Sequence, residues 1–361
     1  MEKRRGRLVI GLMSGTSADA VDAALVETNG EDMVRLLATA ERPYAPAERA
    51  CIREAAQRAR QFPRPLADPA IRAAERMLTL AHAEAVRMLP GWEEAELVGF
   101  HGATVAHRPD LGWTWQIGDA DLLARTLGRP VVHDFRSADM ARGGQGAPLA
   151  PGFHRAVTAH LPRPMGVLNI GGVANLTWFA EDVWGAFDTG PGNALIDDWV
   201  AAHGAGTRDS GGALAASGRV RADVLTALLD HPWFDLSGPK SLDRDDFTIR
   251  PAQGLPLADG AATLTAFTAE AVALALRLLP VRLSRLLVCG GGRRNPALMQ
   301  ALANRTGIAV AAVESEGLDG DSLEAQAFAW LAVRAVDGRP TSWPETTGVS
   351  APVSGGRLAR P

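Results

Sequence analysis

The segment covering residues 11–22 combines turn-forming residues with side chains that can bind phosphate. Its sequence is Gly-Leu-Met-Ser-Gly-Thr-Ser-Ala-Asp-Ala-Val-Asp, and it overlaps a β-branched apolar run over residues 7–13. Backbone N–H groups in a tight glycine turn can approach phosphate oxygens, and Ser and Thr hydroxyls add donors. Asp19 and Asp22 only accept hydrogen bonds, so beside a triphosphate they require a cation such as Mg²⁺. We expect a phosphate-binding hairpin, with an ordinary polar turn as the alternative.

A second glycine hairpin is predicted in the other half of the chain. Residues 168–175 have the sequence Leu-Asn-Ile-Gly-Gly-Val-Ala-Asn, with apolar residues on both sides of Gly171 and Gly172. Such turns are common between strands, so this segment alone is weak evidence. Together with the first hairpin, it suggests two loops that hold one phosphate chain.

Asp188 is the candidate general base. It ends an apolar approach in the segment Gly185-Ala-Phe-Asp-Thr-Gly-Pro-Gly-Asn193, which turns sharply before a helix expected near Ala194. A carboxylate at the end of a strand and facing a cleft can accept a proton from a reacting group. The alternative is that Asp188 only caps the turn.

Three consecutive glycines after an apolar strand form the last candidate. Gly290, Gly291 and Gly292 follow residues 285–289 and would allow an adenine and ribose to lie against the backbone. A glycine-rich C-cap or loop without a ligand is the better explanation of this segment when it is taken alone. No G-x-x-x-x-G-K-[ST] motif occurs, so a P-loop enzyme is excluded.

Strands alternate with helices along the chain, which predicts an α/β fold. The hairpins suggest a duplicated domain with an active-site cleft between the copies. We expect one domain over residues 1–140, a second over 141–339, and a tail, 340–361, that packs on the first. Strands are expected at 7–13, 21–26, 97–100, 130–135, 166–170, 173–177 and 285–289, and helices within 47–90, 119–127, 261–279 and from about 296.

Composition excludes several classes of protein. The 361 residues carry a formal charge of −4 without a concentrated basic face, which argues against nucleic-acid binding. Cys51 and Cys289 are the only cysteines, so a disulfide framework or a cysteine zinc site is excluded. No export signal and no run of eighteen apolar residues is found, so we expect a cytoplasmic protein that does not bind a membrane.

These segments, in this order, resemble the anhydro-N-acetylmuramic acid kinase family of the actin, Hsp70 and hexokinase-like superfamily. The resemblance extends from Gly11 to about Gly348. Besides the segments above, it includes His101-Gly102, Gln116-Ile-Gly-Asp119, Asp134-Phe-Arg136, Asp139-Met140, Gly143-Gly-Gln-Gly-Ala-Pro148, Pro239-Lys-Ser241 and Glu324-Ala325.

The resemblance implies an actin-like, ribonuclease H-like fold and a specific reaction. ATP would phosphorylate O6 of 1,6-anhydro-N-acetylmuramic acid while water opens the anhydro ring, as in murein recycling, and the enzyme would be a homodimer. Asp188 matches the position that activates the water. Asp19 and Glu324 are candidates for holding Mg²⁺, and His101, Arg136 and Asp139 for binding the sugar. The nucleotide would contact Gly15, Thr16, Ser17, Ala18, Asp19, Ala20, Val21, Asp22, Gly171, Gly172, Asn175, Gly290, Gly291, Gly292 and Asn295.

Two positions depart from the family pattern, and one lysine stands out. Ala20 replaces a usual glycine, which would be unfavourable if the position needs a positive φ, and Ala103 replaces a usual glutamine. Lys240 is one of two lysines against 35 arginines, which suggests a need for a compact ammonium group or chance retention. A kinase for another anhydrosugar such as levoglucosan, or a non-catalytic ATP-dependent clamp, are the alternative functions.

Overall fold

The computed structural model describes residues 5–15, 17–244 and 246–361. The chain forms two compact units: unit 1 contains residues 1–161 and 322–361, and unit 2 contains residues 162–321. These limits differ from the expected domain limits, residues 1–140 and 141–339. The reason is that α5 (Pro151–Val157) and α11 (Leu323–Val336) both belong to unit 1, and α11 packs on β1, β2 and β4 of that unit.

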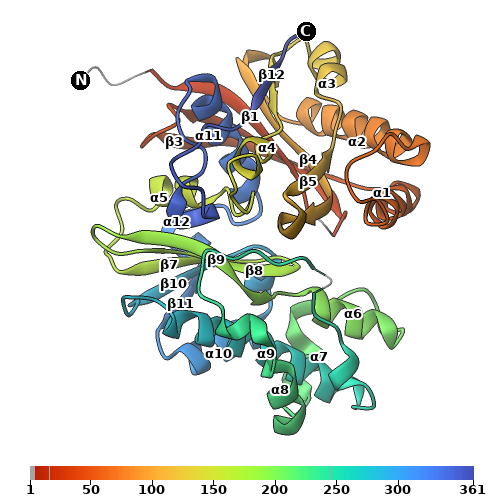
Figure 1. Ribbon diagram of the computed structural model, residues 1–361, viewed down its shortest axis with the longest axis vertical. Helices are drawn as coiled ribbons and strands as arrows, with labels where there is room; N and C mark the ends of the chain where they lie inside the picture. The colour runs from red at the N-terminus through yellow and green to blue at the C-terminus, as the bar shows by residue number, and fades with distance from the viewer. Residues whose placement is uncertain (1–4, 16, 245) are drawn as a thin grey trace. The chain divides into compact units, whose positions relative to one another are not determined.

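Unit 1 contains a seven-stranded mixed sheet (Figure 1). Its strand order is β12-β6-β4-β1-β2-β3, and β5 pairs with β4. β2 pairs antiparallel with both β1 and β3, whereas β4 runs parallel to β1 and β6 runs parallel to β4. The bounds are β1 Arg7–Ser14, β2 Ala20–Thr28, β3 Val34–Pro43, β4 Leu97–Arg108, β5 Trp113–Ile117, β6 Val131–His133 and β12 Arg357–Ala359.

The helices expected within residues 47–90 and 119–127 are present. Asp68 begins α2 by accepting hydrogen bonds from the N–H groups of Ala70 and Ile71, which would otherwise lack a partner in the first turn. Asp119 caps α3 in the same way through Leu122 N–H. The helices of unit 1 are α1 Pro46–Ala59, α2 Pro69–Arg87, α3 Ala120–Leu127, α4 Ser137–Met140, α5, α11 and α12 Pro344–Thr347.

Two paired glycines allow α11 to lie directly on the sheet of unit 1. Gly11 in β1 and Gly99 in β4 are opposite each other in the strand register. A Cβ at Gly11 would overlap the carbonyl of Ala325, and one at Gly99 would overlap that of Phe328. The close approach therefore requires glycine at both positions, and it fixes the first turn of α11, which carries Glu324.

Unit 2 repeats the core of this topology in a five-stranded sheet of order β11-β10-β7-β8-β9 (Figure 1). Here too the middle strand of the hairpins, β8, pairs antiparallel with both β7 and β9. β10 runs parallel to β7, and β11 runs parallel to β10. The strands are β7 Met165–Ile170, β8 Val173–Phe179, β9 Trp184–Pro191, β10 Arg285–Cys289 and β11 Ala309–Ala312. The helices are α6 Ala194–Ala202, α7 Ala213–Ser217, α8 Ala222–Leu229, α9 Leu257–Arg277 and α10 Pro296–Thr306.

The shared strand order confirms the predicted duplicated α/β fold, with the β-meander and parallel extension of the actin-like, ribonuclease H-like type. Two elements differ from expectation. β4 continues to Arg108 because β5 pairs with its second half, and the tail contains β12, which pairs with β6. In the described part of the chain, no helix is both long and apolar enough to cross a membrane.

Candidate active site

The first predicted phosphate loop connects β1 to β2 in unit 1. Met13 pairs with Asp22, so the turn lies between these residues, and Ala18 N–H donates to Gly15 O (3.0 Å). Ser17 and Asp19 are exposed there, while Val21 is buried in β2. Thr16, also predicted to bind nucleotide, lies outside the described residues. The hairpin predicted from the sequence is therefore present, with polar side chains at its tip.

Among the described residues of this turn, Ala18 has a positive φ and Ala20 does not. Ala18 has φ 53° and is buried. Ala20 begins β2 and pairs with Pro43, in an extended conformation that alanine adopts readily. The alanine at position 20 therefore places no strain on the loop.

Asp19 and Glu324, the two candidate metal ligands, differ in environment. Asp19 is exposed, and its Oδ1 lies 3.2 Å from Arg49 Nη1. Glu324 is in the first turn of α11, where burial raises the pKa of its carboxyl while the nearby Arg136 guanidinium opposes that shift. No group of three or more metal-ligating side chains occurs among the residues that the structure describes. Carboxylates of this kind fit Mg²⁺, which takes most of its ligands from water and phosphate, better than a metal held by a protein cage.

His101 and Arg136 form a contact in unit 1. His101 lies in β4, and its Nε2 accepts a hydrogen bond from Arg136 Nε (3.0 Å). Its Nδ1 lies 2.9 Å from Gly102 O, so the proton is on Nδ1. Burial, assisted by the Arg136 charge, holds the pKa of His101 well below 6.5. Because both ring nitrogens have protein partners, His101 is placed to orient Arg136.

Asp139 is joined to the same network through Gly146. Its Oδ2 accepts from Gly146 N–H (2.7 Å), and Gly146 O accepts from Arg136 Nη1 (2.7 Å). Its Oδ1 accepts from the hydroxyls of Ser342 and Thr347 in the tail. With 1% of its surface exposed, Asp139 connects the loop around Gly146 to the tail. The tail was expected to pack on the first domain, but no sequence pattern identified Asp139 as the contact.

The second glycine turn, in unit 2, is joined to the loop that follows β9. Gly171 O accepts from Asn193 N–H and Gly172 O accepts from Gly192 N–H, both at 2.8 Å. The Asn193 side-chain amide donates to Ile170 O (3.1 Å). A Cβ at Gly192 would overlap Gly171 O. These contacts hold the β7–β8 turn against the segment that carries the candidate base.

Asp188 lies in β9, buried to 7% exposure, opposite Asn175 in β8. Asn175 is in turn opposite Asn169 in β7, so three polar side chains form a row across adjacent strands. The Asp188 backbone N–H donates to Lys240 O (3.0 Å), and its Oδ2 accepts from Leu242 N–H (2.8 Å). A hydrogen bond to the charged form favours a carboxylate, so this site suits a base that is ionised before it accepts a proton.

The three glycines after β10 form a turn, as expected. Gly290 has φ 72°, and a Cβ there would overlap the Asn169 side chain, so only glycine fits. Gly291 is exposed and Gly292 is buried. Asn295 accepts a hydrogen bond from Leu298 N–H (3.0 Å) and thereby caps α10. Its side chain has a structural partner already.

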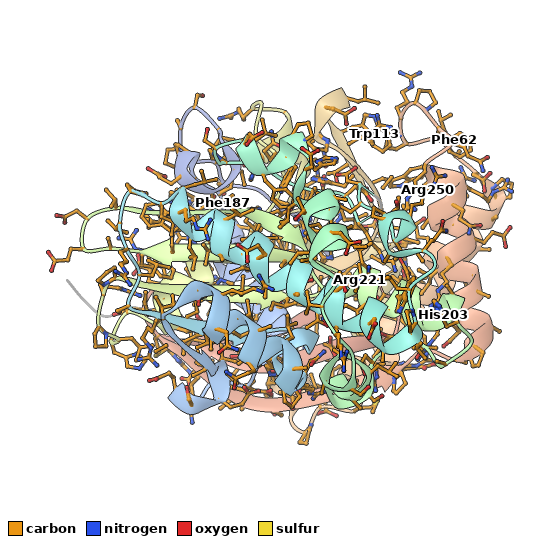
Figure 2. All side chains as sticks on the ribbon, turned by 90° about the horizontal axis from the view of Figure 1, so that it is seen from below. Phe62, Trp113, Phe187, His203, Arg221 and Arg250 are labelled. Carbon is orange, nitrogen blue, oxygen red and sulfur yellow. The ribbon has the colours of Figure 1, made fainter. Side chains whose placement is uncertain are left out.

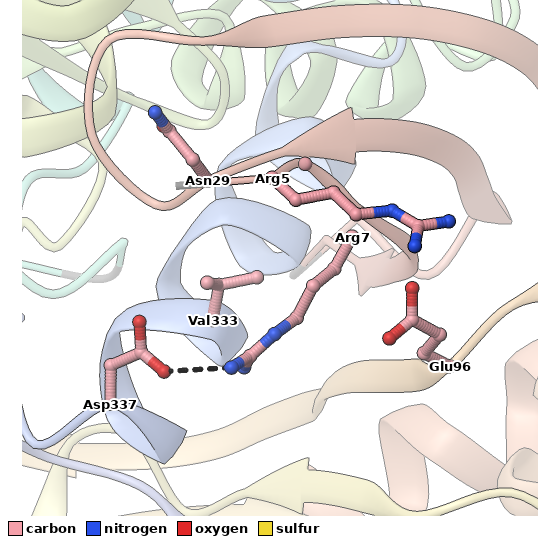
Figure 3. A pocket seen from close by; sticks show the side chains of 7 residues that line it. Arg5, Arg7, Asn29, Glu96, Val333 and Asp337 are labelled. Carbon is pink, nitrogen blue, oxygen red and sulfur yellow. Dashed lines mark ion pairs between the residues drawn. The ribbon is translucent and has the colours of Figure 1, made fainter. Parts of the chain in front are cut away.

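A cavity of about 480 Å³ opens at the opposite end of the unit 1 sheet, where β1 begins (Figure 3). It is lined by Arg7, which pairs with Asp337 at 3.1 Å, and by Arg5, Gly6, Asn29, Glu96 and Val333. None of the residues predicted to act on substrate lines it. We therefore do not assign the reaction to this cavity.

Sequence reasoning missed the partners that hold these side chains. Arg49 lies thirty residues from Asp19 and Leu242 lies 54 residues from Asp188. Leu242 acts through its backbone N–H, which no sequence pattern reveals. Asn169 lies in the glycine hairpin segment 168–175, and its alignment with Asn175 could have been predicted from the two-residue turn between the strands.

Comparison with known proteins identifies the family. The family model described as anhydro-N-acetylmuramic acid kinase matches residues 7–360. The anhydro-N-acetylmuramic acid kinase of Rhizorhabdus wittichii is 55% identical over 361 residues, covering 98% of this chain and 99% of that protein. The chain belongs to the anhydro-N-acetylmuramic acid kinase family. Relatives of the same name from Acidiphilium cryptum and Zymomonas mobilis are 52% and 47% identical, over 98% and 97% of this chain and 98% and 99% of theirs.

Solved structures similar to this family member include a ROK family glucokinase from Streptomyces griseus in complex with glucose and AMPPNP. That protein is 17% identical, with a TM-score of 0.42, over 90% of this chain and 99% of the other. The predicted family is confirmed by the sequence comparisons.

Proposed function

We propose that this protein phosphorylates O6 of 1,6-anhydro-N-acetylmuramic acid with ATP and opens the anhydro ring with water, giving N-acetylmuramic acid 6-phosphate and ADP. The observation that carries the proposal is the buried Asp188 carboxylate, held by Leu242 N–H within β9 in a member of this family. Ring opening needs a base beside the attacking water, and an ionised, oriented carboxylate meets that requirement.

The proposed step conserves atoms and charge. The water oxygen bonds to the anomeric carbon and its proton passes to Asp188. The bond from that carbon to the bridge oxygen breaks, and the bridge oxygen bonds to the γ-phosphorus as the bond to ADP breaks. We assign phosphate binding to the β1–β2 loop and to Gly171, Gly172 and the turn at 290–292. Mg²⁺, when bound near Asp19 and Glu324, would neutralise phosphate charge.

The roles in sugar binding are also proposals. We assign Arg136 to the sugar, with His101 orienting its guanidinium through the 3.0 Å bond from Arg136 Nε. Asp139 acts by holding the loop at Gly146. Ala103, where the family usually has glutamine, is buried in the core of unit 1 opposite Ile117. The substitution therefore supports no change of sugar by itself.

The decisive experiment combines a sugar panel with labelled water. With ATP and Mg²⁺, we expect phosphorylation of 1,6-anhydro-N-acetylmuramic acid and little of levoglucosan. In H₂¹⁸O the label should enter the sugar and not the transferred phosphate, because water attacks carbon. Label in the phosphate, or transfer to neither sugar, would contradict the proposal.

Asp188→Asn tests the base directly. We expect kcat to fall by about 10²–10⁴-fold with ATP binding retained, measured by calorimetry, because the amide cannot accept the proton. Asp198→Asn is the matched control, since Asp198 is a half-exposed aspartate on α6 paired with Arg244. A near-normal rate in Asp188→Asn would move the role of base to another residue. We also propose a homodimer located in the cytoplasm, and sedimentation velocity tests the dimer.

A further inference from the structure

Lys240 has an enclosed environment that the reaction scheme does not use. Its side chain is 7% exposed, although lysine is rarely buried. Nζ donates to Trp233 O and to Leu236 O, both at 2.9 Å. The ammonium also lies 4.5 Å from the centre of the Trp233 ring and 5.9 Å from that of Phe187, which is labelled in Figure 2.

The ammonium binds neutral groups in place of a carboxylate. The contacts of Nζ are the carbonyl oxygens of Trp233 and Leu236 and the faces of the Trp233 and Phe187 rings. Burial lowers the pKa of Lys240 to about 8, while the charges of Asp188 and Asp235 oppose that shift. Carbonyl oxygens and aromatic faces are the partners that a partly desolvated ammonium accepts in place of water. The side chain therefore fastens the turn that spans residues 233–240.

The backbone next to Lys240 holds Asp188 at two points. Lys240 O accepts from Asp188 N–H, and two residues further on Leu242 N–H donates to Asp188 Oδ2. The segment that the ammonium fastens is thus the segment that orients the carboxylate. Figure 2 shows Phe187, the neighbour of Asp188 in β9, and a Cβ at Gly238 would lie 2.9 Å from its ring, so the turn is packed closely on this strand.

We propose that Lys240 is a positioning residue for the general base: its ammonium fixes residues 233–242 so that Leu242 N–H holds Oδ2 of Asp188 in a fixed orientation. This inference rests on the proposed role of Asp188. It also accounts for a lysine at this position in a chain that otherwise uses arginine, because a guanidinium is a planar fork and cannot occupy the compact position between the two carbonyls in the same way.

The test compares Lys240→Met with Lys240→Arg and Asp235→Asn. Methionine keeps the apolar stem and removes the donors, so we expect kcat to fall by about 10²-fold, the loss typical of a small misplacement of a catalytic group. The KM for ATP should change little. Lys240→Arg should recover part of the rate, and Asp235→Asn, which removes an exposed charge without touching the hydrogen bonds, should be close to wild type.

The pH–rate profile separates positioning from simple destabilisation. In Lys240→Met the ionised carboxylate of Asp188 should lose the Leu242 bond and a nearby positive charge, so the acid limb of the kcat profile should move to higher pH. A variant that is only less stable would have fewer active molecules and an unmoved limb. If Lys240→Met has a normal kcat and an unmoved acid limb while Asp188→Asn is inactive, only the role of Lys240 is overturned. A normal rate in Asp188→Asn would instead overturn the proposed base.

Discussion

The two units share a strand order but differ in how they hold their polar groups. In unit 1 the turn between β1 and β2 presents Asp19 to solvent, with Arg49 as a partner. In unit 2 the corresponding turn is Gly171-Gly172, and its carbonyls are bonded to residues 192 and 193. The first turn leaves the side chains of Ser17 and Asp19 exposed, whereas the second fixes the segment that follows the candidate base. A duplicated topology can therefore supply different chemistry from equivalent turns.

The units also differ in how many buried histidines with a lowered pKa they contain. This difference gives the largest expected effect, which is on stability at acid pH. His82, His101, His107 and His154 all lie in unit 1, and burial is the first cause that lowers the pKa of each, to about 4 for all but His101, whose pKa is well below 6.5. An unfolded histidine binds a proton near pH 6.5, so between pH 6.5 and 4 the unfolded state of unit 1 binds more protons than the folded one. The stability of unit 1 should fall as the pH falls through this window, by on the order of 1 kcal/mol per pH unit for each histidine.

Hydrogen exchange measured by mass spectrometry at pH 7 and pH 5, corrected for intrinsic rates, tests this difference. Peptides of unit 1 should lose protection before those of unit 2. In His82→Gln, the decrease in protection of unit 1 between pH 7 and pH 5 should be smaller than in the wild type, because one buried histidine no longer contributes to it. Earlier loss in unit 2 would show that the histidines do not set the acid stability.

The second largest expected effect concerns a glycine in the first strand of each unit, β1 and β7, and its contribution to stability. Gly11 in β1 faces the backbone of α11, whereas Gly166 in β7 faces the side chains of Leu286, Leu176 and Leu283. Backbone cannot move aside as a leucine side chain can, so Gly11→Ala should destabilise the protein by about 3 kcal/mol and Gly166→Ala by about 1 kcal/mol. Urea unfolding of the two variants measures this comparison. Equal losses would mean that α11 can shift on the sheet.

Asp139 and Asp209 compare buried carboxylates in the two units. Asp139 accepts from a loop and from the tail, while Asp209 accepts only nearby bonds from Leu214 and Ala215 N–H. Asp139→Asn should lower stability by about 1–3 kcal/mol, because part of its buried acceptor capacity is lost. It should also increase proteolysis of the tail, while Asp209→Asn leaves the tail intact. If Asp139 contacted the sugar, the KM for sugar would rise with stability unchanged.

The smallest effect concerns the β1–β2 turn. Ala18→Gly should stabilise the protein by up to about 1 kcal/mol, because glycine adopts a positive φ without the penalty of a Cβ. Ala20→Gly should have the opposite sign by about 0.5–1 kcal/mol, because glycine in a strand loses more chain entropy. Thermal unfolding of both variants decides between them. A stabilising Ala20→Gly would contradict the strand conformation at that position.

Much of the fold could be predicted because each hairpin is encoded locally. Apolar strands on both sides of Gly15-Thr-Ser or Gly171-Gly172 can hardly fold otherwise, and the alternation of strands with helices follows from short-range pattern. The extension of β4 was missed because it depends on pairing with β5. The place of α11 was also missed, because contact with β1 through Gly11 joins residues that are more than 300 positions apart.

For the candidate site, the sequence by itself determined which residue types are available: Asp188 in a largely apolar segment, two glycine turns and one unusual lysine. Only the tertiary structure decided what those residues contact. In the structure Asp139 accepts a hydrogen bond from the tail, His101 accepts one from Arg136, and the Lys240 ammonium lies between two carbonyl oxygens. The physical reason is that hydrogen bonds to backbone groups, such as Leu242 N–H to Asp188, depend on where the chain passes and not on which side chain it carries there.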